Sequence, residues 1–181
     1  MILVTGKSAL SEHISQRFDD VIVVGKPEYD FSKQQDCDKL LNDFPNPDII
    51  INTFAKNLSN SWNTLTTNYV ATVYLTVEYY KQLSHGQIIN ISSMSSWWPS
   101  YPGMPFEKFY YGISKLNLSD FGKNFNRIIV DDVKDVIIST IEPGRFKSPM
   151  SNYSGTEVKK IVDLIEFAII NQVTHLSLVS K

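Results

Sequence analysis

Short runs of β-branched residues alternate along the chain with segments of helical length, and this alternation constrains the fold more than any other feature. Continuous isoleucine and valine are typical of strands that are buried on both faces, as in a parallel sheet covered by helices. Such runs occur at residues 2–4, 21–24, 49–51, 88–91, 136–141 and 176–179. Between them, segments suited to helices lie near residues 8–18, 33–44, 60–83, 107–127 and 156–171. The pattern predicts an α/β fold with a doubly wound parallel sheet of about six strands, of the Rossmann type.

Length and composition suit a single globular domain over residues 1–181, with 43 % hydrophobic and 20 % charged residues. The net charge of −2 provides no basic surface, so we expect no nucleic-acid partner. No apolar run is long enough to span a membrane, and the first residues lack the features of a secretory signal. With Cys37 as the single cysteine, we expect a cytoplasmic protein without disulfides or a membrane partner. The three histidines lie far apart without other ligands nearby, so we expect no metal site.

A proline-rich segment at residues 95–106 interrupts the alternation. Its three prolines and one glycine predict a loop without regular structure. The loop also carries two tryptophans, a tyrosine, a methionine and a phenylalanine. Two interpretations stay open: these side chains pack the loop onto the body of the domain, or they form the wall of an apolar ligand pocket.

In a doubly wound sheet, ligands bind at the carboxyl ends of the strands, so the residues after each strand carry most of the functional information. Thr5-Gly6-Lys7-Ser8 follows the first strand, and the helix that starts there would offer free N–H groups to a pyrophosphate. The Gly-Lys-Ser triplet is not a phosphate-binding P-loop, because that motif needs a glycine where this chain has Met1.

A serine, a tyrosine and a lysine form the candidate catalytic group. Ser93 ends the fourth strand, and Tyr111 and Lys115 are four residues apart on a helix, which places them on one face. An ammonium beside a phenol favours the phenolate, so we expect Lys115 to lower the pKa of Tyr111. Tyr29 and Lys33 have the same spacing, but no serine precedes them, and we interpret Tyr29 as a surface residue.

The ordered motifs resemble those of the short-chain dehydrogenase/reductase superfamily over nearly the whole chain. The matching residues are Thr5-Gly6, Asp30, Asn52, Asn68, Ser93, Tyr111-x-x-x-Lys115 and Pro143-Gly144. The resemblance implies an NAD(P)-dependent oxidoreductase that interconverts a carbonyl and an alcohol. It gives Tyr111 the role of proton donor and acceptor, Ser93 that of a hydrogen-bond donor to the substrate oxygen, and Lys115 that of a ribose contact supported by Asn68 through water.

The expected cofactor contacts combine these motif positions with nearby lysines. They are Thr5, Gly6, Lys7, Ser8, Lys26, Asp30, Asn52, Tyr111, Lys115, Pro143 and Gly144. The end of the second strand carries no carboxylate to hold a ribose 2′-hydroxyl, whereas Lys7 and Lys26 could reach a 2′-phosphate. We therefore expect NADP(H) rather than NAD(H).

Two departures from the family pattern stand out. Of the three glycines in the family's phosphate-binding turn, only Gly6 remains, with Glu12 in place of the last and Leu10 or Ala9 in place of the middle one. Only five residues separate Val24 from Asp30, so a helix and a strand are expected to be missing, and the chain resembles a shortened member. The alternative to an enzyme is a non-catalytic dinucleotide-binding or interaction protein with a degenerate turn.

Family members usually self-associate through the helices that match residues 60–83 and 107–127. The first of these segments is rich in aromatic residues, which suits an interface: Trp62, Tyr69, Tyr74, Tyr79 and Tyr80. The alternative is that these side chains cover the sheet. We expect a homodimer or homotetramer that binds a small-molecule substrate.

Overall fold

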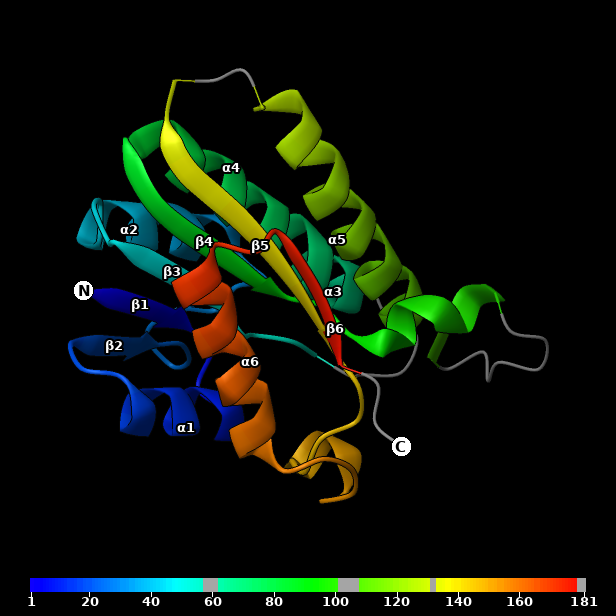
Figure 1. Cartoon of the computed structure of the whole chain (residues 1–181). Coiled ribbons are helices and arrows are strands. Elements are labelled where there is room, and N and C mark those ends of the chain that lie inside the picture. Colours follow the sequence, from blue (N-terminus) through cyan, green and yellow to red (C-terminus); the bar gives the residue numbers. More distant parts are fainter. Residues whose placement is uncertain (57–61, 101–107, 131–132, 179–181) are drawn as a thin grey trace.

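A computed structural model describes residues 1–181 apart from 57–61, 101–107, 131–132 and 179–181 (Figure 1). Its six strands form one parallel sheet in the order β2-β1-β3-β4-β5-β6. The strands are β1 (Ile2–Thr5), β2 (Val21–Val24), β3 (Ile49–Asn52), β4 (His85–Ile91), β5 (Asp135–Pro143) and β6 (His175–Leu178). The predicted doubly wound Rossmann-type sheet is confirmed, and each strand coincides with one of the β-branched runs.

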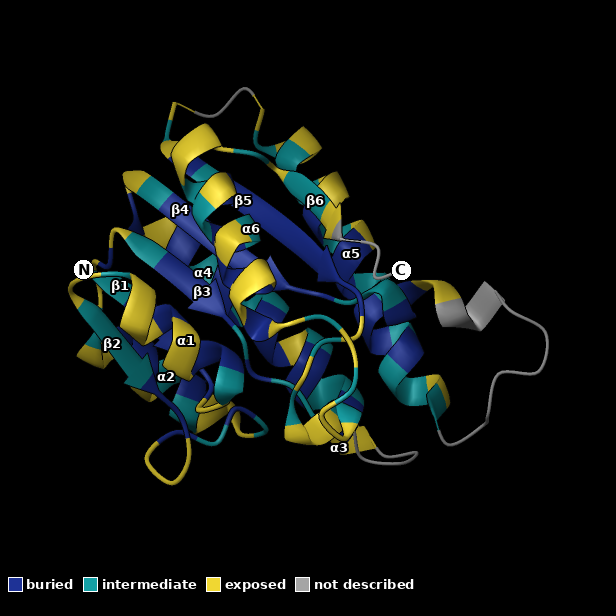
Figure 2. Cartoon of the chain, turned by 60° about the horizontal axis from the view of Figure 1, so that its bottom comes forward, coloured by how far each residue is buried: buried dark blue, intermediate teal, exposed yellow. Residues whose placement is uncertain are grey.

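Helices cover both faces of the sheet, so alternate side chains of each strand enter two separate cores (Figure 2). On one face lie α2 (Gln34–Asp43), α4 (Thr72–Gln82) and α5 (Phe109–Ile128), and on the other α1 (Ala9–Arg17) and α6 (Val158–Asn171). Leu3, Ile50, Ile88 and Ile138 face the first group and are fully buried. Continuous Ile/Val runs are therefore required, because both faces of the central strands are covered.

The chain passes from β2 through a turn directly into α2, without another helix or strand between Val24 and Asp30. This confirms the predicted shortening, and it leaves β2 at the edge of the sheet.

The predicted helix over residues 60–83 is present, with an irregularity in its middle. It comprises α3 (Trp62–Leu65), the π-helix η1 (Thr66–Ala71) and α4. Residues 60 and 61 lie outside the described part. Wider π-turns are frequent at functional sites, and this one contains Asn68.

The prediction that residues 95–106 lack regular structure is wrong for their first half. Met94–Ser100 form a 3₁₀ helix, η2, while residues 101–107 lie outside the described part. Ser93 starts this helix, because its hydroxyl accepts a hydrogen bond from the Ser95 N–H at 3.1 Å and its carbonyl accepts one from the Ser96 N–H at 2.9 Å. Short 3₁₀ turns need few repeating bonds, so they tolerate a proline near their end.

Candidate active site and dinucleotide site

A row of buried polar side chains crosses the carboxyl end of the sheet. Thr5, Asn52, Asn90 and Thr140 occupy equivalent positions on four neighbouring strands. Thr5 Oγ1 donates to Asn52 Oδ1, and Asn52 Nδ2 donates to Asn90 Oδ1, both at 2.8 Å. Thr5 and Asn52 are at most 2 % exposed. The side chains of these two predicted cofactor residues therefore brace the strand ends from inside.

The turn after β1 depends on its remaining glycine. Gly6 has a φ of +105°, and a Cβ there would lie 2.7 Å from the backbone of Phe54. Its N–H donates to Val24 O at 2.7 Å, which joins the turn to β2. Only glycine suits both the dihedral angle and the close approach.

Ser8 caps α1 at the end of this turn. Ser8 Oγ accepts from the Ser11 N–H at 3.3 Å, and Ser11 Oγ accepts from the Ser8 N–H at 2.7 Å. Leu10, at one of the missing glycine positions, is buried in the core on the α1 face. Glu12 is exposed in the first helical turn, where a carboxylate complements the helix dipole. The residues that replace the family's glycines, Leu10 and Glu12, thus stabilise α1.

The two lysines expected near a 2′-phosphate are exposed, and each forms an ion pair. Lys7 Nζ lies 2.8 Å from Glu28 Oε2, and Lys26 Nζ lies 2.8 Å from Asp30 Oδ2. Burial opposes ionisation of Asp30, but hydrogen bonds from Lys26 and Ser32 outweigh it and hold the pKa of the Asp30 carboxyl well below its usual range. The exposed Lys7–Glu28 pair contributes little free energy, whereas Asp30 is also held by the N–H and hydroxyl of Ser32.

Ser93, Tyr111 and Lys115 meet where β4 ends against the first turns of α5. A side-chain hydrogen bond links Ser93 to Tyr111. Lys115 is 2 % exposed, and its Nζ lies 5.9 Å from the centre of the Tyr111 ring. Ser92, by contrast, is part of the scaffold, because its hydroxyl donates to the Lys115 carbonyl at 2.8 Å. The structure thus brings together the three residues that the motif selected.

The pKa of Tyr111 departs from the expectation. Burial raises the pKa of its hydroxyl, and the hydrogen bond from Ser93 offsets part of this effect. Lys115 does not lower it in this structure, because its ammonium is directed to the carbonyl oxygen of Ile91 at 2.9 Å. Burial also lowers the pKa of Lys115 to about 8. The expectation that Lys115 lowers the pKa of Tyr111 is therefore wrong.

Asn68 connects three parts of the site. Its Oδ1 accepts from the Lys56 N–H at 2.7 Å and its Nδ2 donates to Lys56 O at 2.9 Å, so it holds the segment after β3 from both sides. The same Nδ2 lies 3.3 Å from Ser114 Oγ, which donates to Tyr111 O at 2.7 Å. The sequence analysis missed Lys56 and Ser114. Ser114 could have been found from its spacing of three residues after Tyr111 on the helix.

The remaining predicted residues divide between the site and the core. Pro143 and Gly144 are buried at the end of β5. Tyr29 is 7 % exposed, so its interpretation as a surface residue is wrong. Its hydroxyl donates to Asp43 Oδ2 at 2.6 Å, and Lys39 Nζ lies 4.1 Å from its ring centre. It is a structural residue of the α2 face.

The aromatic residues of the 60–83 segment do not all face outward. Tyr79 and Tyr80 belong to the core, with 0 % and 8 % exposure, so for them the alternative of covering the sheet is correct. Trp62 is 76 % exposed, and Trp97 on η2 is 48 % exposed.

Among the described residues, no helix has the length and apolar character needed to cross a membrane.

Comparisons with known proteins bear on the fold of the whole chain. No protein-family model matches the chain. The 11-beta-hydroxysteroid dehydrogenase A of Sesamum indicum is 30 % identical over 148 residues, which are 73 % of this chain and 39 % of that protein. The chain thus spans well under half the length of this relative.

Solved structures match almost the whole chain. A short-chain dehydrogenase from Sphingobium yanoikuyae in complex with NADPH has a TM-score of 0.82 at 15 % identity and covers 97 % of this chain and 86 % of its own. A short-chain dehydrogenase from Burkholderia cenocepacia in complex with NADP has a TM-score of 0.80 at 15 % identity, and the match covers 98 % of this chain and 95 % of that one. A 4-hydroxyisoleucine dehydrogenase complexed with NADH and succinate has a TM-score of 0.75 at 21 % identity, and the match covers 98 % of this chain and 97 % of that one. The resemblance seen in the motifs is confirmed: this short chain has the Rossmann-type fold of the short-chain dehydrogenase/reductase superfamily.

Proposed function

We propose that the chain is an NAD(P)-dependent oxidoreductase that interconverts a carbonyl and an alcohol. The observation that carries this proposal is the meeting of Ser93, Tyr111 and Lys115 at the carboxyl end of the sheet. Ligands of doubly wound folds bind at this end of the sheet. The solved structures with NADPH, NADP or NADH have the same fold and support the assignment.

The residues at this end of the sheet fit a dinucleotide. The Gly6 turn packs closely against the backbone of Phe54 and leads into α1, whose first N–H groups suit a pyrophosphate. Lys115 is a buried amine whose described hydrogen-bond partner is a single carbonyl, so it has donors left for ribose hydroxyls. Pro143 ends β5 and Gly144 follows it, at the same carboxyl end of the sheet.

The bound dinucleotide would supply or accept the hydride. In the reductive direction the Tyr111 hydroxyl gives its proton to the substrate oxygen, and the Ser93 hydroxyl donates a hydrogen bond that stabilises the developing negative charge. Lys115, whose ammonium also donates to Ile91 O, holds the ribose. Asn68 keeps the segment around Lys56 and the first turns of α5 in register.

We propose NADP(H) as the preferred form of the cofactor. Lys7 and Lys26 supply exposed positive charge at the turns after β1 and β2, and the exposed pair of Lys7 with Glu28 contributes little free energy. The exposed ring of Trp97 on η2 favours a substrate with apolar surface.

A non-catalytic dinucleotide-binding protein is the second candidate, and the burial of Leu10 at a former glycine position favours it. Two measurements separate the candidates. Under both candidate functions, NADPH should raise the melting temperature of the protein, because it binds the folded state selectively. The enzyme also oxidises NADPH in the presence of small aldehydes and ketones, whereas the binding protein does not. If NADPH causes no thermal shift, both candidates are wrong.

We also propose that residues 1–181 act as one domain and assemble as a homodimer or homotetramer. Trp62 and Val70, with 76 % and 51 % exposure, provide apolar surface on the α3–η1 segment. Aromatic residues of this kind are enriched at interfaces.

A further inference from the structure

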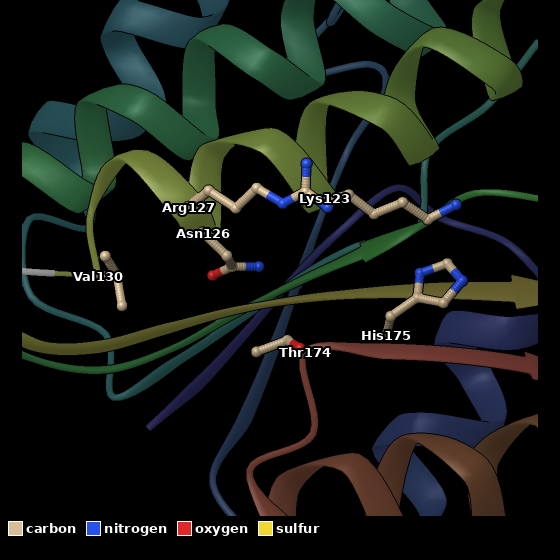
Figure 3. A pocket seen from close by; sticks show the side chains of 6 residues that line it. All are labelled: Lys123, Asn126, Arg127, Val130, Thr174 and His175. Atoms are coloured by element: carbon tan, nitrogen blue, oxygen red, sulfur yellow. The ribbon is translucent and has the colours of Figure 1, made fainter.

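A groove runs along the edge of the sheet between the second half of α5 and the start of β6 (Figure 3). Its volume is about 400 Å³, and it is lined by Lys123, Asn126, Arg127, Val130, Thr174 and His175. Lys123 follows Tyr111 by twelve residues on α5, which corresponds to about 18 Å along the helix at roughly 1.5 Å per residue. The groove is therefore separate from the Tyr111 site.

The lining of the groove is cationic. Lys123 and Arg127 are exposed and lie one helical turn apart, where like charges repel each other. Neither forms an ion pair or a side-chain hydrogen bond with any residue in the described part of the chain, and the described residues that line the groove include no carboxylate. An anion between them would remove this repulsion.

His175 adds a directed polar group. Its ring extends from β6 toward α5 (Figure 3), and its Nδ1 is buried without a hydrogen-bond partner among the described residues. Leaving a buried polar atom unsatisfied costs about 1–3 kcal/mol, so such atoms in native structures call for an explanation. A missing ligand atom is one such explanation.

The other ring nitrogen of His175 faces a buried carboxylate. His175 Nε2 lies 3.7 Å from Oε2 of Glu142, a carboxylate with 2 % exposure that also accepts from Ser177 Oγ at 2.9 Å. His175 Nε2 also lies 3.4 Å from Ser177 Oγ, so Nδ1 is the ring nitrogen that remains for a ligand in the groove. Asn126 closes the floor, because its amide donates to Gly122 O and Ile138 O.

We propose that this groove is a second ligand site, which binds a small molecule through a phosphate or carboxylate group. Lys123 and Arg127 supply the positive charge, His175 Nδ1 supplies a directed hydrogen bond, and Val130 provides an apolar wall for the rest of the molecule. The site does not depend on the proposed oxidoreductase activity, because it shares no residue with it.

Isothermal titration calorimetry on the full chain tests the proposal, with inorganic phosphate in one arm and acetate in the other, at ionic strength fixed with chloride. We expect saturable binding in at least one arm, and the tighter arm identifies the anionic group. Two groove variants, the double variant Lys123→Gln/Arg127→Gln and His175→Phe, should each weaken it about tenfold or more, as expected for lost charge-assisted hydrogen bonds.

A matched control separates the groove from unspecific charge effects. Lys159→Gln/Lys160→Gln removes the same charge from exposed positions on α6 and should leave the affinity unchanged. The proposal is overturned if neither anion binds saturably, or if the groove variants and the control weaken binding equally.

Discussion

The side-chain ammonium of Lys115 donates to the carbonyl oxygen of Ile91 at 2.9 Å inside the protein, where the lysine is 2 % exposed. A charged group in this position is poorly solvated, and burial lowers its pKa from 10.5 to about 8. Below pH 8 the folded chain therefore holds an unfavourable buried charge. This cost falls as the pH rises from 8 to 10.5, because the folded state then loses the proton before the unfolded state does.

Replacing Lys115 by methionine should accordingly stabilise the protein without cofactor. The pKa difference corresponds to about 3 kcal/mol at pH 7, from which the lost hydrogen bond to Ile91 subtracts about 1 kcal/mol. Urea unfolding of both proteins at pH 7 and pH 10 measures the effect. The advantage of Lys115→Met should shrink at pH 10, while NADPH binding should be weaker at both. An equal advantage at both pH values would contradict the assignment of the cost to the buried charge.

Asn68→Ala should disturb the site more than the fold. It removes the two hydrogen bonds to the backbone of Lys56 and the contact with Ser114, so the Lys56 amide should exchange its hydrogen faster and kcat should fall about 10- to 100-fold. Hydrogen exchange followed by NMR checks the first effect, and steady-state kinetics the second. Ser114→Ala, which removes one contact, should leave the Lys56 amide protected. If hydrogen exchange of the Lys56 amide is unchanged in Asn68→Ala, the two hydrogen bonds from Asn68 do not hold the Lys56 backbone.

Lys7→Gln and Lys26→Gln test the preference for NADP(H). Each should weaken NADPH binding by roughly three- to tenfold, as expected for one exposed charge pair, and leave NADH binding nearly unchanged. Lys39→Gln removes a lysine that pairs with Asp43 on α2 and is the matched control. Fluorescence titration gives the dissociation constants. Tighter binding of NADH than NADPH, with no effect of Lys26→Gln, would contradict the proposal.

Self-association should depend on the exposed aromatic surface of the α3–η1 segment. Trp62→Ser should shift the protein toward the monomer, because an interface loses a large apolar side chain. Phe167→Ser, on the exposed side of α6 with 50 % exposure, is the control. Multi-angle light scattering at micromolar concentration reports the mass. A wild-type mass of 20.6 kDa would exclude a dimer under these conditions.

Most of the fold followed from local patterns, since each β-branched run contributed one strand and each intervening segment formed helix, residues 60–83 as α3, η1 and α4. The positions of Ser93, Tyr111 and Lys115 also followed, because strand ends and helical spacing fix where such residues lie. Other features depend on tertiary packing. The π-turn at Asn68, the burial of Tyr79 and Tyr80 and the pairing of Lys7 with Glu28 arise from contacts between elements distant in sequence.

The pKa of Tyr111 shows the same limit. Spacing placed Lys115 beside the tyrosine, but it did not reveal that Ile91 O would hold the ammonium or that burial would dominate. Both effects depend on how α5 packs against β4.

The account as a whole depends on Tyr111 as the proton donor, and Tyr111→Phe tests it most directly. The change removes one oxygen and keeps the ring, so folding and NADPH binding should persist while turnover of any accepted carbonyl falls by about two to four orders of magnitude. Tyr29→Phe and Tyr110→Phe remove the same atom from tyrosines outside the proposed mechanism and should keep turnover near that of the wild type. The measurement is steady-state NADPH oxidation with a panel of small aldehydes and ketones, with cofactor binding checked separately. A Tyr111→Phe protein that binds NADPH and keeps near-full activity would contradict the mechanism.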